Sequence, residues 1–367
     1  MKILLIANHL NVGGITSYLF TLAGGLKQKG HSVYLASSGG QWQEKFSALG
    51  VEHINVPLAT KNEISPKIIF SFFKLKKEVK KFNVDLIHSN SRTTQVLGNL
   101  LSRALHIPHV FTCHGFFKPK LSRLLFPYWG QGVIAISQEV KEHLINDLKL
   151  DAKKISVINN GIDVNNFGDF SKRESIRKDL KINEAPLVGI IARLSDVKGH
   201  IYLIRAIHQV IKDFPTVQLL IIGEGKMKDI LTAEVAKLDI KNNVLFIPEA
   251  RDTQNALAAM DVFVMSSLQE GLGLALMEAM AQGLAVVGSR VGGIKTLIQD
   301  EVNGLLVEPA DSQGLAQAII RLLKDSQLRR SLGVSARKFI MDNFSKSKMV
   351  EATEMFYQQS LKDESRA

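Results

Sequence analysis

The sequence predicts two α/β domains, each built on a doubly wound parallel sheet. Three observations predict this fold: short apolar runs alternate with helical patterns along the whole chain, glycine-bearing loops follow several of these runs, and the length of 367 residues suits two domains. Short apolar runs between helices are typical of strands buried inside a parallel sheet. We therefore expect two Rossmann-like domains whose carboxyl edges face across a cleft.

The composition is that of an ordinary globular protein, with 46% hydrophobic and 22% charged residues. No apolar run approaches the roughly 18 residues of a spanning helix, and Asn8 and His9 interrupt the apolar start, so we expect neither a signal peptide nor a transmembrane helix. The single cysteine, Cys113, excludes an intramolecular disulfide, and no Cys/His spacing indicates zinc. A reducing cytoplasm fits these features.

The positive charge lies in the first half of the chain. Of the net charge of +11, residues 1–165 carry 20 Lys/Arg against 10 Asp/Glu, whereas residues 166–367 carry 26 against 25. The first half is therefore expected to face something anionic, and nucleic acid, anionic lipid headgroups and a phosphorylated substrate are the candidates.

The chain opens with a strand at 2–7, a loop containing Gly13 and Gly14, a helix at 15–29 and a strand at 31–37. This places a glycine turn where doubly wound sheets bind phosphate. The third glycine of a dinucleotide fingerprint is missing, and no acidic residue ends the second strand, so an NAD site is not expected. Further strands of this half are expected at 85–89, 108–112, 133–137 and 155–158.

His114 follows the strand at 108–112 and precedes Gly115, on the rim where functional groups gather. It is a candidate catalytic residue, and a buried structural histidine is the alternative.

Two segments of the first half combine cations with apolar side chains. Residues 65–82 predict a basic amphipathic helix, which is either an outer helix of the sheet with a solvated lysine face or an interfacial helix on anionic lipid. Residues 116–130 place aromatics among lysine and arginine, and either a membrane interface or packing within the domain explains them.

A glycine turn at 159–163 and the polar run through Lys178 predict the domain boundary, with domains at 1–170 and 171–344. The second half repeats the alternation. Its strands are expected at 187–191, 217–222, 244–246, 262–265, 285–287 and 304–307, and its helices at 201–212, 226–238, 253–260, 274–282, 294–299 and from 312 onward.

Two cations and two carboxylates follow strands of the second half. Arg193 and Lys198 come after the strand at 187–191, Glu270 after the strand at 262–265, and Glu278 on the next helix, which Gly283 ends. A helical offset of seven or eight returns to the same face, so both carboxylates can address one ligand. The cations suit a diphosphate, and a carboxylate suits a diol such as ribose. Each glutamate alone could be a solvent-exposed residue, but the set favours a binding site.

The segment EGLGLALMEAMAQG at 270–283 resembles the glutamate–seven–glutamate motif of the retaining GT-B glycosyltransferases of family 4, the glycosyl transferases group 1. The resemblance extends over essentially the whole chain, in order, through GGIT from Gly13, TCHG at 112–115, AISQEV at 135–140, INNGID at 158–163, GIIARLSDVKG at 189–199, LLIIGEGKMKDIL at 219–231 and GLLVEPAD at 304–311. It implies a GT-B fold in which a terminal helix at about 345–367 packs back on the first domain.

By matching position, the resemblance implies that Arg193 and Lys198 bind the diphosphate of a nucleotide sugar and that Glu278 holds its ribose. Glu270 would grip the donor sugar together with the backbone of Gly271, Leu272, Gly273 and Leu274. Gly13 and Gly14 would approach the phosphates, His114 would lie near the reacting centre, and Ile247 and Pro248 would contact the base, uracil or guanine. Family members generally need no metal or other cofactor, which agrees with the lack of a D-x-D motif.

Two segments depart from the family pattern. The first loop, NVGGIT, has no charged residue after its glycines, and PEARD at 248–252 lacks the glycine often found there. These departures leave the acceptor and the base open.

The sequence therefore favours a retaining glycosyltransferase that moves a sugar to a lipid-linked or polysaccharide acceptor, peripheral on the cytoplasmic membrane face. His114, Glu270, Arg193 and Lys198 are its candidate catalytic residues, and the resemblance favours a front-face reaction. The alternatives are a UDP-sugar epimerase of related fold, a non-catalytic nucleotide-sugar binder and a nucleic-acid-binding protein. No nucleic-acid reader motif is present, which argues against the last.

Overall fold

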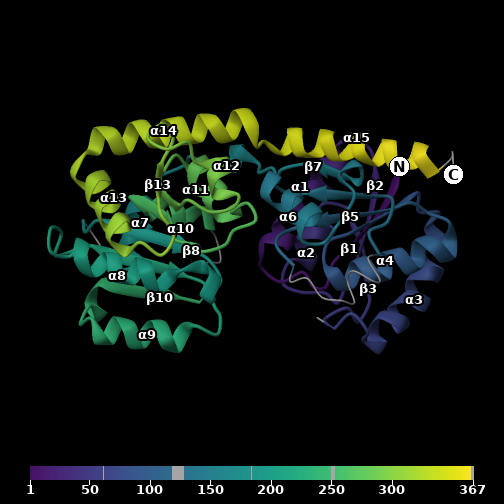
Figure 1. Ribbon diagram of the computed structural model, residues 1–367, viewed down its shortest axis with the longest axis horizontal. Coiled ribbons are helices and arrows are strands. Elements are labelled where there is room, and N and C mark those ends of the chain that lie inside the picture. The colour runs from purple at the N-terminus through teal and green to yellow at the C-terminus, as the bar shows by residue number, and fades with distance from the viewer. Residues whose placement is uncertain (61, 118–127, 183, 249–252, 365–367) are drawn as a thin grey trace. The chain divides into compact units, whose positions relative to one another are not determined.

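The computed structural model describes residues 1–60, 62–117, 128–182, 184–248 and 253–364, which form two compact units (Figure 1). Unit 1 consists of Met1–Ile162 together with Lys346–Ala367, and unit 2 consists of Asp163–Ser345. The first segment of unit 1 thus ends at Ile162, several residues before the expected boundary at 170. Its second segment is the end of the chain.

Unit 1 is built on a seven-stranded parallel sheet of order β3-β2-β1-β4-β5-β6-β7. The chain order reverses on either side of β1, as in the predicted doubly wound topology. The edge strand β3 was not predicted, because only Ile54 of its four residues is buried and so it offers no apolar run. The strands are β1 (Lys2–Ile6), β2 (Ser32–Ser37), β3 (Glu52–Asn55), β4 (Leu86–Ser89), β5 (His109–Cys113), β6 (Gly132–Ala135) and β7 (Ile155–Val157).

Helices cover both faces of this sheet, because successive side chains of a strand point to opposite sides. Ile3 and Leu5 of β1 join the core beneath α1 and α15, whereas Leu4 and Ile6 join the core beneath α3 and α4. A strand buried on both faces therefore appears in the sequence as a continuous apolar run. The helices are α1 (Gly14–Gln28), α2 (Gln43–Ala48), α3 (Pro66–Phe82), α4 (Arg92–Leu105), α6 (Gln138–Asn146) and α15 (Lys346–Glu364).

Helix α15 packs along α1 and completes the core of unit 1. Gly25 of α1 permits this contact, since a Cβ at that position would lie 2.3 Å from a methyl group of Val350. Glu354 binds Lys29 and His31, each at 2.7 Å. Deeper in the core, the Tyr357 hydroxyl lies 2.5 Å from Nδ1 of His88. The end of the chain is thus held by both packing and polar contacts.

Unit 2 contains a six-stranded parallel sheet of order β10-β9-β8-β11-β12-β13. Side chains of β8, β9, β11 and β12 build one continuous core with the helices that pack on the sheet. The strands are β8 (Leu187–Ile191), β9 (Gln218–Ile222), β10 (Val244–Ile247), β11 (Val262–Met265), β12 (Ala285–Ser289) and β13 (Leu305–Val307). The α-helices are α7 (Arg173–Asp179), α8 (His200–Val210), α9 (Lys228–Lys237), α10 (Thr253–Ala259), α11 (Leu274–Gln282), α12 (Ile294–Leu297), α13 (Ser312–Lys324) and α14 (Ser326–Asn343).

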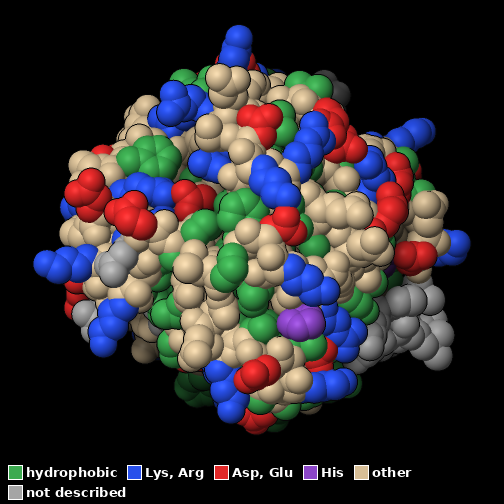
Figure 2. All heavy atoms as spheres, turned by 90° about the vertical axis from the view of Figure 1, so that its left-hand side faces the viewer, with side chains coloured by type: hydrophobic (Ala, Val, Ile, Leu, Met, Phe, Trp, Pro, Cys, Tyr) green, Lys and Arg blue, Asp and Glu red, His purple; other side chains and the backbone are tan. Residues whose placement is uncertain are grey.

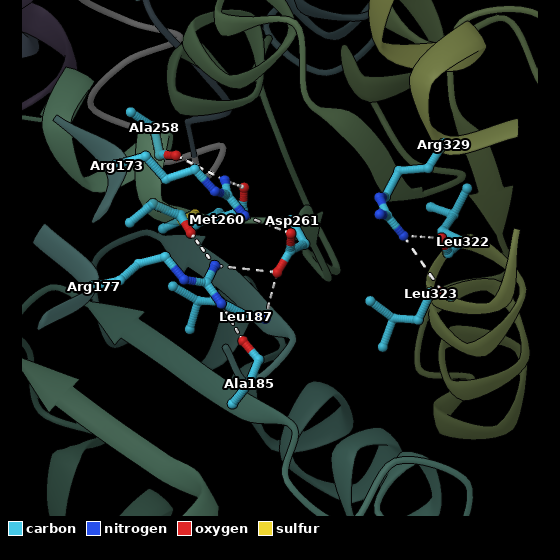
Figure 3. Close-up of polar contacts among 11 residues, drawn as sticks. Arg173, Arg177, Ala185, Leu187, Ala258, Met260, Asp261, Leu322, Leu323 and Arg329 are labelled. Carbon is cyan, nitrogen blue, oxygen red and sulfur yellow. Dashed lines mark hydrogen bonds and ion pairs between the residues drawn. The ribbon is translucent and has the colours of Figure 1, made fainter. Parts of the chain in front are cut away.

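Helix α7 forms within the polar run that was expected to mark the domain boundary. Its two arginines converge on Asp261, the residue before β11 (Figure 3). Arg173 Nη2 lies 2.6 Å from Asp261 Oδ1, and Arg177 Nη1 lies 3.3 Å from Asp261 Oδ2. The same Oδ2 accepts a hydrogen bond from the Leu187 amide at 2.8 Å. The polar segment therefore forms a helix that packs on unit 2, because its two arginines pair with a carboxylate at the start of the neighbouring strands β8 and β11.

Opposite charges are interspersed on the side of the molecule where Figure 1 places α8, α9 and α13, as the space-filling view in Figure 2 shows. Ion pairs of unit 2 such as Arg321–Glu301 and Lys324–Asp213 fit this pattern. The near-neutral balance of the second half of the chain thus reflects mixed local charge. No helix in the described part of the chain is long and apolar enough to cross a membrane.

Candidate active site

Lys198 and Glu270 meet at the carboxyl edge of the unit 2 sheet. They follow β8 and β11, which are neighbours in the sheet, so their loops emerge side by side. Lys198 Nζ forms an ion pair with Glu270 Oε2, and Ser267 Oγ donates to the same oxygen at 3.3 Å. The Leu268 amide also donates to the Val197 carbonyl at 2.7 Å. Two of the four charged residues singled out in this unit are therefore in direct contact.

Glycines hold the loops of this edge at close range. Gly199 has φ 64°, and a Cβ there would lie 2.0 Å from the Ser266 carbonyl oxygen. Gly292 has φ 43°, and a Cβ there would lie 2.0 Å from the Glu270 carbonyl oxygen, which also accepts from the Gly293 amide at 3.0 Å. The turn at 292–293 thus supports the backbone of Glu270. Sequence reasoning gave it no role in the site, although its glycine pair was the available signal.

The predicted helix at 274–282 is confirmed as α11, with Gly283 in the left-handed conformation at its end. Gly273 precedes the helix with φ 97°, and no side chain caps the first turn. The first N–H groups of a helix have no partner within it, so the backbone of Gly271, Leu272, Gly273 and Leu274 offers donors to an anion or a hydroxyl. Leu272 itself is buried and anchors the turn.

Glu278 lies in the second turn of α11 and is partly exposed. Burial raises the pKa of its carboxyl group from 4.5 to about 7. No other described residue forms a hydrogen bond or ion pair with it. A partly desolvated carboxylate without a protein partner is suited to accept hydrogen bonds from ligand hydroxyl groups.

Arg193 follows β8 and is exposed, and its guanidinium contacts no described acidic side chain. Its backbone neighbours are fixed by the glycine loop that follows β9, because the Leu194 amide donates to the Glu224 carbonyl at 2.9 Å. A Cβ at Gly223 would lie 2.1 Å from the Ala192 carbonyl oxygen. Within the described ranges, Arg193 is therefore a cation without an acidic partner, on a well-anchored loop.

His200 is a further residue of this edge that sequence reasoning missed. It begins α8, two residues after Lys198, and is 2% exposed. Burial, with a contribution from the Lys198 charge, lowers the pKa of its imidazole to about 4. The ring is therefore neutral at pH 7, which avoids repulsion with Lys198.

Ile247 and Pro248 lie at the end of β10, on the same edge of the sheet but two strands from β8. The Ile247 carbonyl accepts from the Gly223 amide at 2.9 Å, which ties this strand end to the glycine loop after β9. Ile247 is half-buried and Pro248 is exposed. The rest of the PEARD segment, residues 249–252, lies outside the described residues.

In unit 1, Gly13 and Gly14 form an exposed turn between β1 and α1. Gly13 precedes the helix without a side-chain cap, and a Cβ on either glycine would meet nothing within 4 Å. Open space in front of a helix N-terminus lets an anion approach the backbone N–H groups. The turn is therefore compatible with the expected phosphate contact.

His114 follows β5, and its partner Asn90 follows the neighbouring strand β4. The imidazole Nε2 lies 3.2 Å from Oδ1 of Asn90. The ring also lies edge-on to Tyr18 of α1, with 4.7 Å between ring centroids. Burial lowers the pKa of His114 to about 3, so the ring is neutral at pH 7.

A buried polar chain runs beneath His114. Tyr18 lies 3.3 Å from the hydroxyl of Thr112, which lies 2.7 Å from Nε2 of His88, and His88 in turn contacts Tyr357. Burial keeps the pKa of His88 well below its usual value. The chain supports the residues that contact His114, and nothing in the spacing of the sequence indicated that these side chains would meet.

The described aromatics of the segment at 116–130 pack within unit 1. Phe117 stacks on Phe111 with 6.2 Å between centroids, Phe116 lies edge-on to His143, and Trp129 is 8% exposed. For these residues, packing within the domain is the correct interpretation. Residues 118–127 lie outside the described part of the chain.

The two units thus carry different chemistry. The edge of unit 2 combines cations, carboxylates and the N–H groups of a helix start, which suits a phosphorylated, hydroxyl-rich ligand. Unit 1 contributes a neutral histidine and an open glycine turn. Within the described ranges, no three His, Cys, Asp or Glu side chains gather into a metal-binding group.

Comparison with known proteins agrees with this division. The model of the family described as glycosyl transferases group 1 matches residues 171–339, and the model of glycosyltransferase family 4 matches residues 12–166. The chain is 29% identical to the UDP-Gal:alpha-D-GlcNAc-diphosphoundecaprenol alpha-1,3-galactosyltransferase of Escherichia coli, over 82% of each chain. It is 27% identical to the N-acetyl-alpha-D-glucosaminyl L-malate synthase of Bacillus anthracis, over 96% of each chain.

Among solved structures, Anabaena HepE in complex with UDP and glucose superposes with a TM-score of 0.87, at 24% identity over 98% of this chain and 99% of that one. This likeness confirms the fold, and the two family models together account for the core of both units. The chain therefore belongs to the family 4 glycosyltransferases, the glycosyl transferases group 1, and has their GT-B fold.

Proposed function

We propose that the protein transfers a sugar from a UDP-sugar to a lipid-linked acceptor, with retention of the anomeric configuration and without a metal ion. The observation that carries this proposal is the contact between Lys198 and Glu270 on neighbouring loops of unit 2, with Glu278 on helix α11, which follows the Glu270 loop. A cation next to two hydroxyl-binding carboxylates matches the diphosphate, ribose and sugar of a nucleotide sugar.

Lys198 and Arg193 would bind the diphosphate. Lys198 is paired with Glu270 in the present structure, so donor binding would supply phosphate oxygens to the lysine and sugar hydroxyl groups to the glutamate. The backbone of Gly271, Leu272, Gly273 and Leu274 would add N–H donors. Charge on the departing diphosphate would then be stabilised by the two cations, the electrostatic role that a divalent metal takes elsewhere.

Glu278 would hold the ribose hydroxyl groups, and the chain at Ile247 and Pro248 would contact the base. The E. coli relative is named for a UDP-Gal donor, and the Anabaena structure is a complex with UDP and glucose, which supports uracil as the base. GDP-sugars are the alternative donors. Gly13 and Gly14 of unit 1 would approach the phosphates, and His114 would contact the transferred sugar.

In the proposed front-face reaction, the acceptor hydroxyl oxygen bonds to the anomeric carbon on the side from which the phosphate leaves. The bond from the anomeric carbon to the phosphate oxygen breaks, and that oxygen takes the acceptor proton. The products are the glycoside and the nucleoside diphosphate. Glu270 binds hydroxyl groups in this scheme and is not a nucleophile. Inverted product, or a covalent glycosyl-enzyme trapped with Glu270→Gln, would contradict it.

A lipid-linked acceptor would place the protein at the cytoplasmic face of a membrane as a peripheral enzyme. The lysine excess of the first half of the chain supports this, because anionic headgroups attract clustered cations. The E. coli relative is named for a diphosphoundecaprenol-linked acceptor, which supports the same acceptor class. Polysaccharide is the alternative acceptor.

The proposal is tested by screening UDP- and GDP-sugars for release of nucleoside diphosphate, with and without a membrane extract as acceptor. We expect slow hydrolysis of one UDP-sugar that rises strongly when the extract is added, and no loss of activity with EDTA. Isomerisation of a UDP-sugar without any acceptor would identify an epimerase instead. Binding without turnover would identify a nucleotide-sugar binder, and preference for oligonucleotides would point to nucleic acid.

A further inference from the structure

Helix α3 of unit 1 exposes a cluster of large apolar side chains. Ser65 and Pro66 start the helix, and Ile68, Leu75 and Val79 bury its inner face against the core shared with α4. On the outer face, Ile69 is 58% exposed, Phe70 64% and Phe73 67%. Ile64, in the turn before the helix, is 87% exposed, so four of the thirteen strongly exposed large apolar residues in the described chain lie within ten positions.

These apolar residues share one arc of the helix with lysines. At 100° per residue, Ile69 and Phe73 lie above Lys80, and Phe70 lies above Lys77 and Lys81. Lys74, Lys77, Lys80 and Lys81 are exposed, and Lys67 is exposed in the first turn. The only acidic residue of the helix, Glu78, lies 3.8 Å from Lys81. The outer face therefore has an apolar first half and a basic second half.

The apolar half lies near the candidate site of unit 1. Helix α3 starts after β3, at the carboxyl edge of the sheet, and Asn8 joins the two regions. The Asn8 amide nitrogen donates to the Leu58 carbonyl at 2.9 Å and to the Thr60 carbonyl at 2.8 Å. Asn8 belongs to the loop that leads to Gly13 and Gly14. The segment before α3 is thus bonded to the loop that forms the glycine turn.

Only one class of partner matches both halves of this face. Nucleic acid would neutralise the lysines but would leave Ile69, Phe70 and Phe73 in water. A second copy of the chain could cover the apolar side chains, but its own lysines would face those of the first copy. The interface of an anionic bilayer takes apolar and aromatic side chains below the headgroups and lysine ammonium groups at their level.

We propose that the outer face of α3 inserts into the surface of an anionic phospholipid bilayer, with Ile69, Phe70 and Phe73 as apolar anchors and Lys74, Lys77 and Lys81 on the headgroups. This deepens the proposed function, because it assigns the surface through which the enzyme meets a lipid-linked acceptor. Docking through α3 would bring the carboxyl edge of the unit 1 sheet, with Gly13 and Gly14, close to the headgroup layer.

The test is sedimentation of the full-length protein with vesicles of phosphatidylcholine and phosphatidylglycerol, compared with phosphatidylcholine alone, at increasing NaCl. We expect preference for the anionic vesicles and release by salt. The variant Phe70→Ser/Phe73→Ser should bind at least about tenfold more weakly, because two apolar anchors are lost. Lys74→Gln/Lys77→Gln/Lys81→Gln should weaken binding by about fivefold per lysine and reduce the salt dependence.

Matched controls come from unit 2. Ile230 is 53% exposed on α9, and Lys178, Lys237 and Lys241 are exposed. Ile230→Ser and Lys178→Gln/Lys237→Gln/Lys241→Gln should bind vesicles as the wild type does. Tryptophan fluorescence of Phe70→Trp gives independent evidence. When vesicles are added, the emission that this variant has beyond that of the wild type should shift to the blue and be quenched by brominated lipid.

Unchanged binding by the α3 variants, equal loss in the controls, or no quenching of Phe70→Trp would overturn the inference. Tighter binding to oligonucleotides than to vesicles, or a protein dimer lost with Phe70→Ser/Phe73→Ser, would assign the face to another partner. Donor hydrolysis without vesicles separates the two proposals. If α3 binds vesicles but no nucleotide sugar is turned over, only the proposed function fails; if turnover occurs without vesicle binding, only this inference fails.

Discussion

The amide Oδ1 of Asn90 lies 3.2 Å from Nε2 of His114 and thereby fixes the tautomer of the candidate catalytic ring. Because an amide oxygen only accepts, Nε2 carries the hydrogen and Nδ1 keeps its lone pair. The low pKa of His114, about 3, keeps the ring neutral at pH 7. A neutral ring whose Nδ1 can accept a hydrogen bond suits recognition of a sugar hydroxyl better than proton transfer.

Removal of the Asn90 amide should therefore impair turnover through His114. We expect Asn90→Ala to lower kcat by about tenfold to a hundredfold with a smaller change in donor KM, because the ring loses its orientation. His114→Ala should cause a comparable loss, and the double variant should be little worse than either. Steady-state kinetics on donor hydrolysis and transfer measure this.

Two comparisons sharpen that experiment. Asn90→Asp should raise the pKa of the His114 imidazole, because a carboxylate favours its charged form, and activity should then fall toward acidic pH. Asn146→Ala, at an exposed position of α6, should behave as the wild type. Full kcat in Asn90→Ala would show that Asn90 does not position the ring.

The Lys198–Glu270 ion pair should matter more for catalysis than for stability. Lys198→Met and Glu270→Gln should each lower kcat/KM by about a hundredfold to a thousandfold, because each alters a residue that we propose to bind the donor. Arg193→Ala should weaken UDP binding with an unchanged free energy of unfolding, since the exposed guanidinium contacts no described acidic group. Isothermal titration with UDP and urea unfolding distinguish the two effects.

A double-mutant cycle would show whether Lys198 and Glu270 act as a unit. Residues in direct contact typically couple by about 0.5–3 kcal/mol, so the double variant should lose less than the sum of the single losses. Strictly additive losses in kcat/KM would indicate that the ion pair does not persist when donor is bound.

The sequence was sufficient to predict the fold, because both sheets are buried on two faces. Strands such as β1 and β11 then appear as uninterrupted apolar runs, and the glycine at the end of α11 marks its boundary. The edge strand β3 and the helix α7 were missed because their residues are mostly polar. Helix α7 is held by arginine contacts to Asp261, and local patterns carry no information about such distant partners.

The same limit applies to the candidate site. Strand order brings Lys198 to Glu270, and the family resemblance identified both residues through two separate segments. The residues that support Glu270 and His114 were not predicted, because the contacts of Gly292 with Glu270 and of His88 with Tyr357 depend on approaches between segments far apart in the chain. Single-residue signals are present at these positions, but a glycine or a histidine alone does not name its partner.

Glu278 should make both stability and donor binding depend on pH. Its folded-state pKa of about 7 lies above the value of 4.5 expected without burial, so the folded protein holds the proton more tightly. The stability cost of ionising this group therefore grows as pH rises from about 4.5 to 7 and is constant above that range. Glu278→Gln, which cannot ionise, should be more stable than wild type at pH 8 by about 2 kcal/mol.

The same variant should bind donor more weakly. A charged carboxylate accepts ribose hydroxyl groups more strongly than an amide, so we expect Glu278→Gln to raise donor KM by about tenfold. Wild-type KM should rise as pH falls from 8 to 6, and the variant should not show this rise. Thermal unfolding and donor kinetics at pH 5, 7 and 8 test the prediction. It would be contradicted if the variant's gain in stability over the wild type were larger at pH 5 than at pH 8.

Asp261 should be a main determinant of unit 2 stability, because it accepts from Arg173, Arg177 and the Leu187 amide (Figure 3). Asp261→Asn removes the charge that compensates two arginines, and we expect it to destabilise the protein by about 2–4 kcal/mol. Asp229→Asn, at an exposed position of α9, should change the free energy of unfolding little. Equal unfolding midpoints in urea for the two variants would show that the arginines find other partners.

Tyr357 should fix α15 to unit 1 through its contact with His88. Tyr357→Phe keeps the packing but leaves Nδ1 of the buried His88 without this partner, which should cost about 1–3 kcal/mol of unfolding free energy. Met355→Ala, on the same helix but 63% exposed, should cost almost nothing. Hydrogen exchange of α15 amides gives a local readout, and Tyr357→Phe should accelerate it more than Met355→Ala does. If the two variants exchange alike, the hydroxyl contact does not hold the helix, and packing of Val350 against Gly25 must account for its docking.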